Sequence, residues 1–241
     1  MAENKVFLYK VKTEQKAEMQ KILAFIAIFV MLVSCNTINF SDQPQGVIEY
    51  EVIYLTNKSG MPTNLLPRKV VLKFRSNKSI TTIEGFMGLF SLSNITDFRK
   101  HTNSILLKVM DNRLVYEGKK NEPPFFLSKY FDCSIAITNE KKVLAGLPCY
   151  KAIISVPNNK EKKIVYFTQA IPLKNANKAS PFASLEGILM EFDLSLTNIE
   201  MHLKATKYIQ TEVDAAIFKV DDSYKEVSQR KIISILNKLL E

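Results

Sequence analysis

Few residues of this chain belong to the types that usually carry out chemistry. Its 241 residues include three cysteines (Cys35, Cys133 and Cys149), two histidines (His101 and His202) and no tryptophan. Thiolates and imidazoles are common metal ligands, and histidine is the usual general base, so little material for either role is present. The seven glycines form no phosphate-binding loop, and Gly-x-Ser-x-Gly and His-Glu-x-x-His are absent. We therefore expect no enzyme, no cofactor and no metal site.

Cys35 ends an uncharged run that begins at Ile22, directly after Lys21. A basic residue, a short apolar segment and small residues before a cysteine are typical of a secretory signal with a lipoprotein cleavage site. The segment Leu32-Val33-Ser34-Cys35 resembles the bacterial lipobox. This resemblance implies that Cys35 is lipidated and becomes the first residue of the mature protein.

Residues 22–34 have two other interpretations, a transmembrane anchor and a buried core helix. As a helix these thirteen residues would extend about 20 Å, whereas a bilayer core is about 30 Å thick and needs roughly 20 residues. The polar residues after Cys35 disfavour a core helix. Translation starts at Met1 or, because Met19 opens a compact signal peptide by itself, at Met19. In either case we leave residues 1–34 out of the fold.

The composition limits the classes of partner. The chain has 33 lysines and arginines, 24 acidic residues and a net charge of +9. The lysines are scattered and form no arginine-rich run, so we expect no nucleic-acid partner. A basic surface suits anionic lipid headgroups or acidic glycans, although the same charge also serves solubility alone. The expected partner is the membrane, through the lipid anchor on Cys35.

The other two cysteines, Cys133 and Cys149, are a candidate disulfide in the oxidising compartment that a secretory signal implies. We expect a turn at residues 139–142, which would place the two cysteines nearly opposite each other on neighbouring strands. A bridge requires their Cα atoms to lie within roughly 7 Å of each other.

After a polar tether at residues 35–45, residues 46–241 are expected to form a single domain. Apolar and polar residues alternate along much of it, as is typical of half-buried strands. The alternating segments are residues 46–55, 69–75, 79–83, 105–109, 113–116, 133–138, 144–156, 163–168, 187–194 and 200–210. Only residues 227–240 show the apolar stripe of an amphipathic helix.

About ten strands and one helix predict a mainly β fold. Because one helix cannot cover both faces of such a sheet, we expect a curled antiparallel sheet, a half-barrel or open barrel, with a C-terminal helix. A barrel of this kind can enclose a cavity for an apolar ligand such as a lipid or an acyl chain. The alternative is a core filled by the protein's own side chains, in a structural or partner-binding module.

The most unusual apolar stretch is residues 85–90. Its two glycines favour a flexible loop over a stable strand. We expect Phe86, Met87, Leu89 and Phe90 to form an apolar lip, at the cavity mouth or as an insertion point into the membrane. The alternative is a loop folded over the core.

Residues 46 to about 225 resemble the GLPGLI-type and related lipoproteins of the bacterial envelope. The likeness is carried by Gly46-Val-Ile-Glu-Tyr-Glu-Val, by Gly146-Leu-Pro-Cys-Tyr-Lys-Ala, by Val165-Tyr-Phe-Thr, by Ser184-Leu-Glu-Gly-Ile-Leu at the position of the signature, and by Phe218 with Tyr224. Such families look like the lipoprotein-localisation (LolA/LolB-like) half-barrel superfamily, which implies lipid or lipoprotein handling.

Asn36 follows the cysteine that is expected to be lipidated, and it is not the aspartate of the best-known inner-membrane retention signal. Its identity therefore favours the outer membrane, facing the periplasm.

Overall fold

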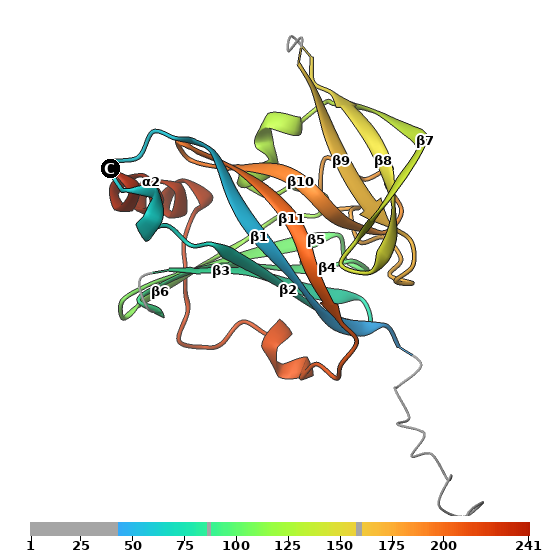
Figure 1. The fold of residues 1–241 in the computed structure, drawn as a ribbon. Helices are drawn as coiled ribbons and strands as arrows, with labels where there is room; N and C mark the ends of the chain where they lie inside the picture. Colours follow the sequence, from blue (N-terminus) through green and yellow to red (C-terminus); the bar gives the residue numbers. More distant parts are fainter. Residues whose placement is uncertain (1–42, 86–87, 158–160) are drawn as a thin grey trace, which may run out of the picture. The chain divides into compact units, whose positions relative to one another are not determined.

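A computed structural model describes residues 43–85, 88–157 and 161–241 (Figure 1). Cys35 with its lipobox, most of the tether, Phe86 and Met87 lie outside these residues. The elements described below belong to one compact unit, Ser41–Glu241. No helix in the described ranges is long and apolar enough to cross a membrane.

The described chain forms one sheet of twelve strands, in the order β12-β6-β5-β4-β3-β2-β1-β11-β10-β9-β8-β7. Neighbouring strands pair antiparallel, except that β12 runs parallel to β6 over two residues. The strands are β1 (Gln45–Asn57), β2 (Lys69–Arg75), β3 (Lys78–Gly85), β4 (Phe90–Asp97), β5 (Thr102–Val109), β6 (Asn112–Glu117), β7 (Ser134–Leu144), β8 (Leu147–Ser155), β9 (Lys162–Thr168), β10 (Ile188–Leu196), β11 (Ile199–Ile209) and β12 (Lys225–Glu226). The sheet curls without closing, and the mainly β fold class is confirmed (Figure 1).

The concave face of the sheet holds the main core. Alternation along β1 turns Ile48 and Tyr50 inward, where they join Phe74 of β2 and Leu203 of β11. The single α-helix of the described chain, α2 (Gln229–Leu240), adds Ile232, Leu236 and Leu240 to the same core. The apolar residues of α2 therefore lie on one face of the helix, as the sequence predicted.

The described ranges also contain the 3-10 helices η1 (Thr63–Leu65), η3 (Phe125–Tyr130) and η4 (Ala215–Phe218). A second apolar cluster lies against β8 and β9. It joins Leu127 and Tyr130 of η3, Phe167 of β9, and Phe182 and Leu185 from the segment between β9 and β10. Strands β7, β8 and β9 thus have a core of their own, and they are called the wing below.

The β7–β8 hairpin turns at Ala145 and Gly146, not at residues 139–142. The φ angles of these two residues are 51° and 80°, as a two-residue hairpin turn with positive φ at both positions requires. The register then pairs Cys149 with Lys142, near the turn.

This register overturns the predicted disulfide. Ser134 pairs with Ser155 at the open end of the hairpin, so Cys133 lies beyond that end. Along β8, Ser155 is six residues from Cys149, or about 20 Å. Cys133 and Cys149 are both free thiols, with Cys149 buried and Cys133 partly buried. The prediction was wrong because it misplaced the turn.

The predicted lip is also wrong at Phe90. This residue begins β4, where it pairs with Gly85 of β3 and Val109 of β5, and its exposed fraction is 5%. Leu89 precedes the strand and is 52% exposed. Phe90 is therefore a core side chain, while Leu89 is a surface residue.

Phe90 and Leu89 form a matched pair for a stability test. Phe90→Ala should lower the free energy of unfolding by about 3–5 kcal/mol, because it leaves a cavity in the core. Leu89→Ala should change it by less than about 0.5 kcal/mol, because Leu89 is largely exposed. Urea denaturation of both variants measures the difference. Equal stabilities would contradict the placement of Phe90.

The two thiols can be tested by alkylation without reductant. Burial raises the pKa of Cys133 and of Cys149 above the usual range for a thiol, so the reactive thiolate is scarce at neutral pH. We expect Cys149 to stay unlabelled in the folded protein and both cysteines to be labelled in denaturant. Peptide mapping checks this, and a Cys133–Cys149 cross-linked peptide from protein purified without reductant would refute it.

Candidate functional site

The concave face of the sheet encloses a cavity of about 130 Å³. A smaller cavity of about 50 Å³ shares five of its lining residues, including Asn94, Phe126 and Leu194, and is therefore its neighbour. For comparison, an engineered apolar cavity of about 150 Å³ binds benzene or xenon, whereas drug-sized ligands occupy about 300–1,000 Å³. The interior is mostly filled by side chains, and the remaining space fits one ring or a short acyl segment.

Strands form the wall of the larger cavity and irregular segments cover it. Most of the wall is apolar and includes Tyr50, Leu72, Phe74, Phe192, Leu194 and Leu203. The cover comprises residues at η3 and in the segment between β9 and β10, namely Pro124, Phe126, Leu127, Leu173, Ala176, Asn177, Ala179 and Ser180. Among the residues that the structure describes, no charged residue lines either cavity.

The segment between β9 and β10 is held in shape by two specific residues. Asn177 Nδ2 donates hydrogen bonds of 2.9 Å to the carbonyl oxygens of Leu185 and Gly187. Gly187 has a φ of 122°, and a Cβ there would lie 2.1 Å from the carbonyl oxygen of Thr168. Only glycine fits this position, which directly precedes Ile188 and Leu189 of the cavity lining.

A polar group on β4 and β5 interrupts the apolar wall. Thr96 and Asn103 are direct cross-strand partners, and Asn94 lies two residues before Thr96, on the same face. Asn103 Nδ2 donates hydrogen bonds of 2.9 Å to the carbonyl oxygens of Glu122 and Ala179. Asn103 Oδ1 accepts from Asn94 Nδ2 at 3.1 Å and from Thr96 Oγ1 at 2.8 Å. This group connects the wall to both covering segments.

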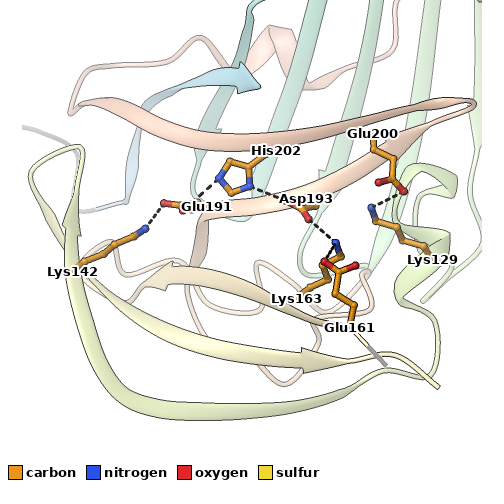
Figure 2. Close-up of polar contacts among 8 residues, drawn as sticks. All are labelled: Lys129, Lys142, Glu161, Lys163, Glu191, Asp193, Glu200 and His202. Atoms are coloured by element: carbon orange, nitrogen blue, oxygen red, sulfur yellow. Dashed lines mark hydrogen bonds and ion pairs between the residues drawn. The ribbon is translucent and has the colours of Figure 1, made fainter. Parts of the chain in front are cut away.

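A second polar group, the charge cluster, lies on the opposite face of β10 and β11 (Figure 2). Its centre is His202, whose Nδ1 lies 2.7 Å from Asp193 Oδ1 and whose Nε2 lies 3.4 Å from Glu191 Oε1. Lys142 of β7 lies 2.5 Å from Glu191 Oε2, and Lys163 of β9 lies 3.9 Å from Asp193 Oδ2. The ion pairs therefore join the wing to β10 and β11.

Two further ion pairs extend the charge cluster (Figure 2). Lys163 pairs with Glu161 at 3.0 Å, and this contact raises the pKa of Lys163. Lys129 of η3 lies 3.6 Å from Glu200 of β11. All four carboxylates thus have a lysine partner.

The charge cluster lacks the arrangement of a nucleophile with its base. Ser195 points to the same face of β10 as Asp193, but its buried Oγ has no hydrogen-bond partner within the described ranges. Both nitrogens of His202 face carboxylates instead, so no hydroxyl is activated by the imidazole. No group of three or more His, Cys, Asp or Glu side chains in the described chain is placed to hold a metal ion. The cluster is best explained as a structural clamp.

The sequence alone did not predict this charge cluster. The available signal was Glu191-Phe-Asp193, which places two carboxylates on one face of a strand. The β10–β11 register pairs Asp193 directly with His202. Without that register the three side chains could not be brought together.

Asp193 and Glu161 give a matched test of the clamp, because both face Lys163. Asp193→Asn should lower the free energy of unfolding by about 1–3 kcal/mol, since this side chain is only 10% exposed and also bonds His202. Glu161→Gln should have an effect below about 0.5 kcal/mol, because Glu161 is 69% exposed. Denaturation curves distinguish the two, and an Asp193→Asn variant as stable as wild type would refute the clamp.

Comparisons with known proteins give a likeness of fold. No family model matches this chain, and no curated protein does. A solved structure described as PNGF-II in space group P21 matches with a TM-score of 0.53 and 13% identity, over 80% of this chain and 33% of that one. A second, PNGF-II in space group C2, matches with a TM-score of 0.50 and 15% identity, over 80% and 32%. This chain spans about a third of the length of the proteins that it matches, and identities this low show the fold alone.

Proposed function

We propose that this protein is a lipid-anchored envelope protein that binds a small apolar ligand inside its curled sheet, without catalysing a reaction. One observation carries the proposal: the concave face keeps an uncharged cavity of about 130 Å³ where a fully packed core would have none. The resemblance to lipid-handling half-barrels points to an acyl chain or another lipid fragment as the ligand.

The anchor in this proposal is Cys35. The lipobox resemblance supports it, and the lipid would hold the domain at the outer membrane, facing the periplasm. One acyl chain binds a membrane only marginally, whereas two or more anchor stably. The polar tether would then leave the sheet free to reach ligands near the bilayer surface.

The cavity volume limits the part of a ligand that is buried. Each buried CH₂ contributes about 0.8 kcal/mol, which is about a fourfold gain in affinity. Since a cavity of this size accepts benzene, the gain should stop at roughly six carbons. A longer chain would leave its remainder outside the wall.

Titration of the full chain with a series of straight-chain alcohols tests the proposed function. Affinity should rise about fourfold per added CH₂ and then level off. Ala176→Leu should abolish binding, because Ala176 lines the cavity and a larger side chain fills it. Ala136→Leu makes the same change at an exposed position on β7 and is the control.

Two outcomes would count against this proposal. Calorimetric titrations that stay flat at every chain length would favour the alternative, a structural or partner-binding module with a filled core. Binding that Ala176→Leu leaves unchanged, in a variant that melts like wild type, would place the ligand elsewhere on the protein.

A further inference from the structure

We infer that the ligand of the interior cavity is a neutral, mostly apolar molecule that carries one hydrogen-bond donor, and that Asn94 recognises this donor. The inference rests on the proposed function, because it specifies the ligand class of the same cavity. A ligand of this kind is a small alcohol or phenol, rather than a hydrocarbon or a fatty acid carboxylate.

The first observation is an unused acceptor in the wall. Asn94 is 8% exposed and lines both neighbouring cavities. Its Oδ1 is buried and has no hydrogen-bond partner within the described ranges. A buried acceptor without a partner destabilises a fold unless a water molecule or a ligand supplies a donor, and a ligand that displaces such a water must replace its hydrogen bond.

The second observation fixes which end of the Asn94 amide is free. Both N–H groups of Asn103 are used by the carbonyl oxygens of Glu122 and Ala179, which can only accept. Asn103 Oδ1 must therefore face Asn94 and Thr96. A flipped Asn94 amide would set its oxygen against that oxygen, so Nδ2 of Asn94 stays in the group and Oδ1 is left over.

The same contacts exclude Thr96 as the missing donor. A threonine hydroxyl has one hydrogen, and Thr96 Oγ1 donates it to Asn103 Oδ1 at 2.8 Å. The Asn94 amide in turn donates to Thr96 Oγ1 at 3.0 Å. Every donor of the group is used within it or by the cover, and Asn94 Oδ1 is the acceptor of the group that no donor reaches.

The rest of the wall defines the body of the ligand. The lining side chains are uncharged, and most are apolar, such as Leu72, Phe192 and Leu194. Burying a carboxylate or an ammonium against them without a counter-charge is strongly unfavourable. A neutral molecule with an O–H or amide N–H and an apolar remainder of about benzene size satisfies both conditions.

Calorimetry on the full chain with phenol and toluene tests the inference. The two have nearly the same shape, but only phenol carries a donor. Phenol should bind up to about tenfold more tightly than toluene to wild type. Asn94→Leu should remove or reverse this preference, because it replaces the acceptor by an apolar group of similar size. Thr82→Val, which deletes a hydroxyl bonded to Ser93 outside the larger cavity, should preserve it.

Fluorobenzene provides a test on wild type alone, in case Asn94→Leu fails to fold. It places an acceptor where phenol has a donor, so it should bind no better than toluene. Equal binding of phenol, toluene and fluorobenzene would overturn this inference and leave the proposed function standing. A phenol preference that survives Asn94→Leu would overturn the role of Asn94. Absence of binding by all three would overturn both.

Discussion

The structure depends on one constraint: a single wide sheet must bury its own concave face. Twelve strands present far more apolar surface than α2 can cover, so the sheet curls until inward residues of β1, β2, β4, β10 and β11 share one core. Alternation of side chains then places every second residue inside. Between this curved wall and the segments that cover it, packing is incomplete, and the cavity lies there.

The polar group in the wall serves the fold and the proposed site together. Asn103 holds the carbonyl oxygens of Glu122 and Ala179, and so fastens both covering segments to β5. The same two hydrogen bonds orient Asn94 through Asn103 Oδ1. Closing the cavity and presenting an acceptor to its ligand are therefore consequences of one network. On the other face of β10 and β11, the charge cluster holds the wing in place. There the contacts are ion pairs of lysine side chains, whereas the polar group in the wall uses hydrogen bonds of amide side chains.

Much of the fold follows from the sequence, because alternation is a local signal. Residues 69–75 were expected as a strand and form β2 with those bounds, and the stripe at 227–240 became α2. Strand β4 was not predicted, because both of its faces are covered. Ile95 packs on the outer face with Leu106 and Val115. The inward side chains of Asn94 and Thr96 are polar and line the cavity. The apolar–polar alternation of this strand runs only from Phe90 to Ser93 and breaks at Asn94, which is too short a pattern to detect.

The candidate site was less predictable, because it depends on register. Ala145 and Gly146 form the hairpin turn but were assigned to the start of the strand predicted at residues 144–156, and misplacing the turn produced the wrong disulfide. The unused acceptor on Asn94 exists only once Asn103 is tied to two distant segments.

A crystal structure of the full chain grown with phenol tests this account most directly. It should show phenol between Leu72 and Phe192, with its hydroxyl within about 3 Å of Asn94 Oδ1. Phenol bound only at the surface, or an interior without phenol at saturating concentration, would contradict the account.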